Sequence, residues 1–556
     1  MGVDHRLRFS FFILLFYFKR LESTCLIGIP LTVSLIWTGG LVYFFLGHLN
    51  MMTGFGAAIL GGLGSDYGIY LLTRYYHERS LGHGVKAACE QAFGSTGKAT
   101  YGSMLTMVAG LVALVFSKFG VFVEFGIVGA LGLVTTYVGM MLIVPALLTI
   151  SEKWKYPVSW KGFGKIFPNT DAWTTSATFQ KIFYPRKAFL GVILIFIICA
   201  ISVFTLPVQS KIFFEEGQME SPDLPGNKLG RRVNQVMKHT VDPTVLIAHG
   251  ADEEEKIVTL LDERLKNNAS NLVYDRVLGL SSFIPQEQIQ KKKLLARILN
   301  KLTQTTLILK SEKDYLSETL KDSLAAPVVL RKDIPYEVRR LFEAIHQKDI
   351  YAVFLFPAFS RADSESMKRY QDGVYALKKE LGLLDMEVAD GTFIASDTVR
   401  LIEREAPRGM FLILTFFTIV LFVMVKSWTR GLMILSNLLG SLFLLSGLLW
   451  LAGIRLNIMN IAVIPVVLGG GIDIYIHFSH RFDERIPMRE ILKGEVPAMF
   501  ISSLTSMVGF GGFLLVSSSG LRSIGWVSVL GLGLVTLMAV FGFPRFLLLG
   551  ARWKNK

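Results

Sequence analysis

The sequence predicts a mainly α-helical membrane protein with two pseudo-repeated transmembrane bundles and one extracytoplasmic α+β domain. Three observations indicate this architecture. Several apolar runs exceed 18 residues, which is long enough for a helix to cross a bilayer. One such run, with an aspartate in its second half, occurs twice, once around Asp66 and again around Asp473. Between the two groups of apolar runs lies a polar region, from about residue 207 to 407.

The composition supports membrane insertion and excludes several other classes. The 556 residues are 51% hydrophobic, and the mean hydropathy is +0.46, which is high for a soluble protein of this size. In a membrane protein, a net charge of +14 usually reflects basic residues in cytoplasmic loops. No pattern of aromatic and basic residues indicates nucleic-acid binding. The three cysteines (Cys25, Cys89 and Cys199) have no metal-ligand spacing and form no disulfide framework.

Ten or eleven spanning helices are expected. The apolar run at 9–18 is too short to cross a bilayer and reads as the end of a span whose beginning is missing. The ten complete spans are predicted at about 23–46, 51–74, 98–117, 123–149, 187–206, 408–426, 430–452, 457–479, 498–518 and 523–549.

These spans give seven predicted segments. They are the remnant of a spanning helix (1–22), the first-half bundle (23–150), a basic cytoplasmic linker (151–186), the first span of the second half (187–206), the extracytoplasmic domain (207–407), the second-half bundle (408–550) and a cytoplasmic tail (551–556).

Loop charge predicts the orientation. Basic residues gather in alternate turns, in the 151–186 linker and at the C-terminal end, whereas the turn at 47–50 and the turn at 117–120 carry little charge. Because Lys and Arg concentrate in cytoplasmic loops, these basic segments are predicted to be cytoplasmic. The 207–407 domain is then predicted to lie on the opposite side of the membrane.

The 207–407 region alternates short strands and helices. Strands are expected at 243–249, 351–356 and 386–389, and helices at 252–266, 364–380 and about 394–405, the last leading into the membrane. One or two amphipathic helices are expected within 286–324. This pattern favours an α+β domain with two βα units.

The candidate site is built on the two intramembrane aspartates. A charged carboxylate within a bilayer costs several kcal/mol unless it is paired, hydrated or protonated, so such acids mark ion or proton pathways. The residues predicted to form a proton relay with Asp66 and Asp473 are Tyr67, Tyr70, Thr106, Tyr475, His477, Thr505 and Ser506. The neighbouring glycines are predicted to let helices approach closely. They are Gly62, Gly64, Gly68, Gly470 and Gly471.

Each of these residues also has a purely structural interpretation. An intramembrane aspartate can have a purely structural role, as a hydrogen-bond partner for a neighbouring helix. His477 lies near a span end, where histidine is more often structural or interfacial than a relay member. The hydroxyls of Thr106, Thr505 and Ser506 often bond back to their own helix backbone.

No sequence motif indicates an enzyme or a cofactor. The chain has no GxxxxGK[ST] loop, so direct use of ATP is not expected. It also has no HExxH, GxSxG or Cys/His cluster, so neither hydrolysis nor a metal centre is predicted.

Two motifs together resemble a known superfamily. They are Gly62-Leu-Gly-Ser-Asp66-Tyr67-Gly-Ile-Tyr70, followed by Arg74-Tyr-Tyr-His-Glu78, and the second copy over 469–484. The chain is similar to the resistance–nodulation–division (RND) exporters, and most similar to their lipid-exporting branch of MMPL proteins and hopanoid transporters. The resemblance implies twelve spans in two halves, each half with a large outer domain after its first span. The first span and first outer domain are therefore expected to be missing here, through a fragment, a misread start, a decaying gene or supply by a separate polypeptide.

The resulting expectation is a proton-motive-force-driven exporter of lipids or other hydrophobic molecules, in a bacterial inner membrane. The alternatives are a non-transporting sensor, an auxiliary of protein translocation, and an inactive remnant. The sequence leaves both the substrate and the choice between monomer and homo-oligomer open. In the second motif Asp473 is followed by Ile474, with the tyrosine one residue later, so the resemblance leaves the detailed hydrogen bonding of the second half open.

Overall fold

The structure, a computed structural model, describes residues 21–153, 197–198, 201, 224–237, 243–267, 272–304, 310–347, 349–361, 363–425, 427–483, 488–544 and 547. The chain forms two compact units, one of Met1–Asn227 with Thr398–Lys556 and one of Lys228–Asp397. The predicted helix remnant at 9–18 and the tail at 551–556 lie outside the described residues. So do the 151–186 linker and the 187–206 span, except for residues 151–153, 197–198 and 201.

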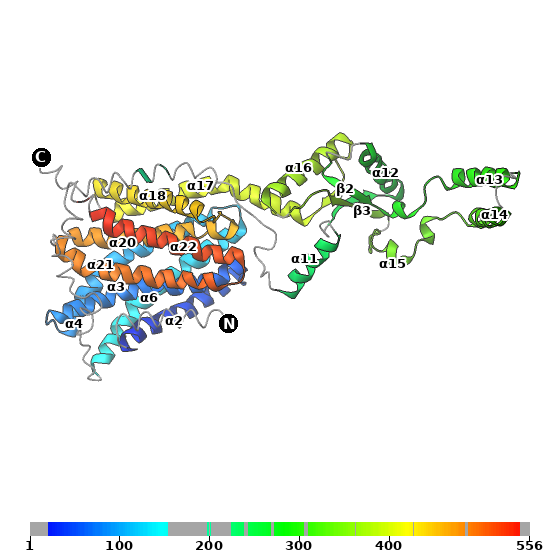
Figure 1. Ribbon diagram of the computed structural model, residues 1–556. Helices are drawn as coiled ribbons and strands as arrows, with labels where there is room; N and C mark the ends of the chain where they lie inside the picture. The colour runs from blue at the N-terminus through cyan, green and yellow to red at the C-terminus, as the bar shows by residue number, and fades with distance from the viewer. Residues whose placement is uncertain are drawn as a thin grey trace. The chain divides into compact units, whose positions relative to one another are not determined.

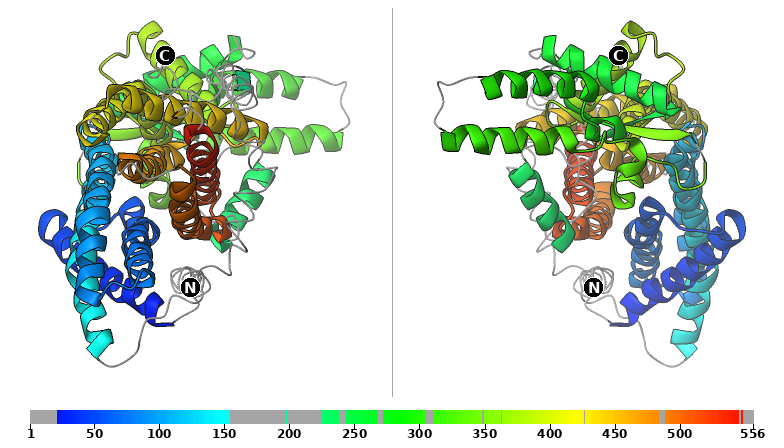
Figure 2. Two further views of the ribbon diagram at one scale, coloured as in Figure 1. Left: turned by 90° about the vertical axis from the view of Figure 1, so that its left-hand side faces the viewer. Right: turned by 90° about the vertical axis from the view of Figure 1, so that its right-hand side faces the viewer.

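The first unit is a helical bundle made by both halves of the chain. The first-half helices are α2 (Leu21–Leu46), α3 (Met51–Ser80), α4 (Val85–Gln91), α5 (Gly97–Val115) and α6 (Gly120–Lys153). The second-half helices are α17 (Gly391–Val425, whose first turns belong to the other unit), α18 (Trp428–Leu451), α19 (Ile458–Ile461), α20 (Ile464–Asp483), α21 (Met488–Gly511) and α22 (Ser519–Leu537). Figure 1 shows α20, α21 and α22 running alongside α3 and α6, and Figure 2 shows the blue-to-cyan first half beside the yellow-to-red second half.

Eight helices among the described residues are long and apolar enough to cross a membrane. They coincide with eight of the ten predicted spans, so the expected mainly helical membrane fold is confirmed. A ninth predicted span, 51–74, lies within α3, which is helical throughout but is not one of the eight. The tenth predicted span, at 187–206, falls almost entirely outside the described residues.

Helix ends in the bundle follow local sequence signals. Asn50 precedes α3, and its side chain accepts a hydrogen bond from the Thr53 N–H at 2.8 Å. The Asn50 N–H donates in return to Thr53 Oγ1 at 2.8 Å, which completes a capping box. Two π-helical turns were not predicted, one at Ala92–Thr96 before α5 and one at Met538–Gly542 after α22.

The second unit contains a four-stranded antiparallel sheet in the order β2-β3-β1-β4. The strands are β1 (Thr244–His249), β2 (Tyr274–Leu278), β3 (Ile350–Pro357) and β4 (Val388–Ala389). Helix α12 (Ala251–Asn267) connects β1 to β2, and α16 (Ser364–Glu380) connects β3 to β4. This connectivity is the split βαβ arrangement of ferredoxin-like domains, so the predicted α+β class is confirmed; β2 is the strand that sequence reasoning missed.

One face of this sheet is packed by α12 and α16. The apolar cluster combines alternate residues of β1 and β3, such as Leu246 and Val353, with Ile257 of α12 and Tyr370 of α16. This alternation is what a sheet with one buried face requires. The remaining helices of the unit are α11 (Pro225–Met237, which begins just before the unit), α13 (Gln288–Gln304), α14 (Lys310–Ala325) and α15 (Tyr336–Arg339).

Candidate functional site

The two halves of the bundle are interleaved by two matching helix contacts. Helix α3 of the first half packs against α21 of the second, and α20 of the second half packs against α5 of the first. A Cβ atom on Gly62 would lie 3.4 Å from the Cα of Ser506, and one on Gly469 would lie 3.3 Å from the Cα of Met107. Both contacts bring helix backbones together at a glycine, as small residues do between membrane helices.

The other predicted glycines face neighbouring helices within the halves. A Cβ on Gly64 would come 2.5 Å from Thr136 of α6, and one on Gly68 would come 3.0 Å from Ile27 of α2. Gly470 and Gly471 face α22, where a Cβ would lie 3.3 Å from Leu532 and 2.2 Å from Val535, respectively. All five glycines predicted to mediate packing therefore lie at helix–helix contacts.

Asp66 is buried at the contact between α3 and α21. Its side chain is held by two hydroxyl groups of the other half, since Ser506 Oγ donates to Oδ2 at 2.9 Å and Thr505 Oγ1 donates to Oδ1 at 3.4 Å. Thr505 also bonds to its own backbone, at the carbonyls of residues 501 and 502. A hydroxyl can donate to a carboxylate and can also accept from a carboxylic acid, so these partners suit both protonation states of Asp66.

Asp473 has a different set of partners. Its Oδ1 lies 3.4 Å from Nε2 of His477, one helical turn further along α20. The His477 ring is stacked on the Tyr70 ring of α3, with 3.9 Å between centroids and 10° between planes. All three side chains are buried, so the acid of the second half reaches the first half through a histidine and an aromatic stack.

The remaining predicted relay residues lie among these helices with other contacts. Thr106 donates its hydroxyl to the Gly102 carbonyl at 2.7 Å. The Tyr67 hydroxyl lies 3.9 Å from Met107 Sδ, and the Tyr475 ring packs edge-on against Phe543. Of the nine predicted relay residues, the structure thus brings six into contact pairs that connect the halves or join an acid to its partner. They are Asp66, Thr505, Ser506, Tyr70, His477 and Asp473.

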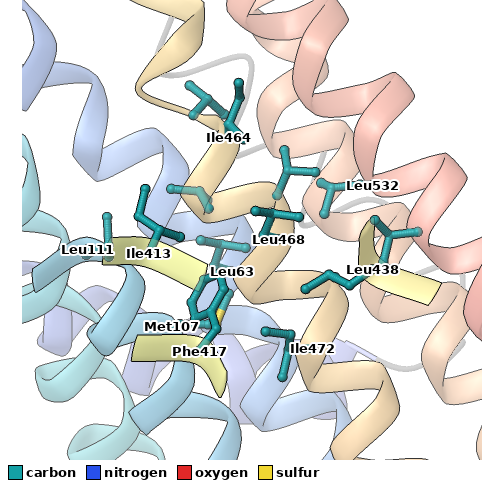
Figure 3. Packing of buried hydrophobic residues seen from close by; sticks show 14 of the residues in the cluster. Leu63, Met107, Leu111, Ile413, Phe417, Leu438, Ile464, Leu468, Ile472 and Leu532 are labelled. Atoms are coloured by element: carbon teal, nitrogen blue, oxygen red, sulfur yellow. The ribbon is translucent and has the colours of Figure 1, made fainter. Parts of the chain in front are cut away.

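A layer of apolar side chains borders the acids. Leu63 of α3, Met107 of α5, Phe417 of α17 and Ile472 of α20 pack into one cluster drawn from both halves (Figure 3). Such packing excludes bulk water from the neighbourhood of the carboxyl groups. Proton exchange with either side then requires the helices to move or water to enter along the polar side chains.

Sequence reasoning did not single out Asn437. It is buried on α18, and its Oδ1 would lie 2.8 Å from a Cβ placed on Gly542 in the second π-helical turn. An asparagine within an apolar run was the available signal, because intramembrane polar residues are costly. π-helical turns occur often at functional sites, and this one has no sequence signature.

The site offers no ligand set for a metal. Among the described residues, no group of three or more His, Cys, Asp or Glu side chains could hold a metal ion. The arrangement places two carboxyl groups and an imidazole, which are groups of the kind that exchange protons, in the bundle, and two hydroxyl groups donate hydrogen bonds to one of the carboxyl groups.

Comparisons with known proteins agree with this architecture. Residues 9–180 match the MMPL family. The membrane protein MJ1562 of Methanocaldococcus jannaschii is 37% identical over 147 residues, which is 26% of this chain and 38% of that protein. The siderophore exporter MmpL5 of Mycobacterium tuberculosis is 25% identical over 145 residues, which is 25% of this chain and 15% of that protein.

A solved structure has a similar fold. The translocon-associated membrane protein SecDF from Thermus thermophilus superposes with a TM-score of 0.58 at 12% sequence identity, covering 100% of this chain and 62% of that one. The matches to the two sequence relatives extend over 38% and 15% of their lengths.

Proposed function

Because the chain is related to the MMPL family over residues 9–180 and has the SecDF fold, we propose that it is a proton-coupled transporter of lipids or other hydrophobic molecules. It acts in the cytoplasmic membrane, with the 228–397 unit on the outer side. The proton gradient supplies the energy, and Asp66 and Asp473 bind and release the protons.

One observation carries this proposal. Two buried acids lie where the halves interleave, and the contacts of each reach the opposite half. A change in the protonation of Asp66 changes its bonds to α21, and a change at Asp473 or His477 changes the contact with Tyr70 of α3. Both changes act on α3, so proton binding is converted into a movement of one half relative to the other.

The asymmetry of the two acids suggests a division of roles. Asp66 has hydroxyl partners that can hydrogen-bond to it in either protonation state, which suits a group that must bind and release a proton. Asp473 shares its environment with a histidine, so the pair exchanges a proton without placing an isolated charge in the apolar interior. In this scheme, movement of the halves drives the substrate along a separate lipid-facing route.

The test uses purified protein in liposomes with a trapped pH-sensitive dye and a nitrobenzoxadiazole-labelled phospholipid. An imposed pH gradient should drive proton flux and transfer of the labelled lipid between leaflets. Asp66→Asn and Asp473→Asn should each abolish both signals while the protein still inserts and elutes as wild type. Thr106→Ala is the matched control, because that hydroxyl bonds only to its own helix among the contacts described.

Two results would refute the proposal. Undiminished gradient-driven flux in either aspartate variant would remove the proposed proton carriers. Proton flux without any lipid transfer would instead favour a translocation auxiliary or a sensor with the same fold.

A further inference from the structure

Helices α2 and α3 are close together at one end and apart at the other. Near the Asp66 level, a Cβ on Gly64 would come 2.9 Å from Leu31, and one on Gly68 would come 3.0 Å from Ile27. Toward the turn that joins the two helices, a Cβ on Gly39 or on Gly54 would meet nothing within 4 Å. The side chains of the described residues therefore leave open space between the two helices toward the turn.

A cavity of about 350 Å³ lies in this space. Its walls are mostly apolar and come from three helices, with Leu35 and Val42 of α2, Leu60 of α3 and Val128 of α6 among them. Gly39 and Gly54 also line it, which explains its width. The volume lies within the range of small-molecule binding sites.

One end of the cavity is polar and fixed. His48 lines the cavity, and its Nε2 lies 3.3 Å from Glu124 Oε1 at the start of α6. Asn50, the cap of α3, donates to Glu124 Oε2 at 2.5 Å. Glu124 thus ties the α2–α3 turn to α6 and places a carboxylate beside His48.

The charge and the surroundings indicate the kind of ligand. No Lys or Arg is among the described residues that line the cavity, and the carboxyl group of Glu124 lies beside His48, so an anionic head group finds no basic partner of that kind there. Tyr43 lines the cavity, and it and its neighbours Phe44 and Phe45 are strongly exposed, as in the aromatic belts at membrane surfaces. The cavity is therefore open to molecules that lie in the membrane with their polar end at its surface.

We propose that this cavity binds a single-chain amphiphile, with the hydrocarbon chain between α2 and α3 and a cationic head group beside His48 and Glu124. This site lies apart from the acids and goes beyond the proposed transport. Binding needs no proton gradient, so its failure and the failure of proton coupling are distinguishable.

The test uses the full chain in phospholipid nanodiscs and a dodecylamine carrying a diazirine in its chain. Photolabelling should saturate, map to peptides of α2 and α3, and be displaced by unlabelled dodecylamine at concentrations about tenfold lower than by laurate, since tenfold corresponds to 1.4 kcal/mol. Glu124→Gln should remove this preference for the amine over the acid.

Filling the cavity gives the decisive comparison. Gly39→Leu and Gly54→Leu should each reduce labelling about tenfold or more, because leucine occupies the space of several methylene groups. Gly40→Leu is the matched control: a Cβ there also meets nothing within 4 Å, but Gly40 does not line the cavity.

Equal labelling of Gly39→Leu, Gly54→Leu and Gly40→Leu would overturn the proposal. So would labelling of the wild type that does not saturate, or that laurate displaces as well as dodecylamine does. The wild-type competition needs no variant, so it decides the question even if a leucine variant fails to fold.

Discussion

The ring of Tyr70 on α3 lies flat against the ring of His477 on α20, with 3.9 Å between their centroids. This stack joins the first half of the bundle to the second, one helical turn from each buried acid. His477 also lies 3.4 Å from Asp473, so any change in the charge of this pair alters the interaction between the stacked rings.

Replacing the stacked ring should separate packing from proton chemistry. Tyr70→Phe keeps the aromatic face and should retain most of the gradient-driven transport. Tyr70→Leu removes the stack, which is worth about 0.5–1.5 kcal/mol, and should slow transport several-fold. Transport rates in liposomes measure both; equal rates for the two variants would show that the stack has no part in coupling.

The glycine contacts should tolerate no added side chain. Gly471→Ala places a Cβ 2.2 Å from Val535, and such overpacking costs about 1–3 kcal/mol. Gly28→Ala on α2 is the control, because a Cβ there meets nothing within 4 Å. Thermal unfolding in detergent should show a lower midpoint for Gly471→Ala and an unchanged or higher one for Gly28→Ala.

A buried ion pair should stabilise the second unit. Arg361 donates to Asp390 Oδ2 at 2.6 Å, and both side chains are only 3% exposed. Removing one partner leaves a buried charge, so Asp390→Asn should cost about 3–5 kcal/mol. Hydrogen exchange of β1 and β3 peptides measures this loss.

The pair between Arg264 and Glu380, whose side chains are 31% and 55% exposed, provides the comparison. Glu380→Gln should cost less than about 1 kcal/mol, with no change in exchange of the same strands. Similar losses in the two variants would contradict the structural assignment of Arg361 and Asp390 to a buried network.

The second unit should lose stability at high pH. Burial raises the pKa of Tyr370 from 10.0 to about 12, so between these values the unfolded chain has lost a proton that the folded one keeps. The contribution of Tyr370 to the free energy of unfolding is fully present below pH 10. It decreases by about 1.4 kcal/mol per pH unit as the pH rises toward 12. Tyr370→Phe should reduce this loss, and Tyr315→Phe, on an exposed side chain, should not; hydrogen exchange of β3 at several pH values measures it.

The second unit should also lose stability at low pH, through the N-cap residue of α16. Hydrogen bonds from the backbone of Ser366, above all, lower the pKa of Asp363, so its stabilising charge is present above the ordinary pKa of an aspartate and is lost as pH falls through the lowered value. Asp363→Ala should cost about 1 kcal/mol at neutral pH and should remove this acid dependence. Exchange rates of the α16 peptide test both effects.

The spans were predictable because apolar length and loop charge are direct physical requirements of a bilayer. The central strand β3 and helix α16 were predictable for similar reasons, through a continuous apolar run and a clear amphipathic pattern. The strand β2, with the sequence Tyr274-Asp-Arg-Val-Leu278, was not. It is short and charged, and its pairing with β3 depends on residues about 80 positions away.

The site was only partly predictable for a similar reason. Motif repetition identified Asp66 and Asp473, and helical spacing placed Tyr70 and His477 on the same faces as the acids. Thr106 precedes Met107-Val108 as Ser506 precedes Met507-Val508. No pattern within one half could show that Ser506 reaches Asp66, or that Thr106 bonds to Gly102 instead. Such differences arise from the packing of the halves, and repetition of a motif suggests more symmetry than the structure has.

The bond between Asp66 and Ser506 joins residues 440 positions apart, which has a consequence for biosynthesis. At a synthesis rate of about 5–20 residues per second, Asp66 waits between about 20 and 90 seconds after translation before its partner exists. During that interval the nascent chain must shelter an aspartate by protonation, by water or by the insertion machinery. Maturation is therefore a late, whole-chain event, and ribosomal stalling between the two helices would leave a nascent protein open to quality-control degradation.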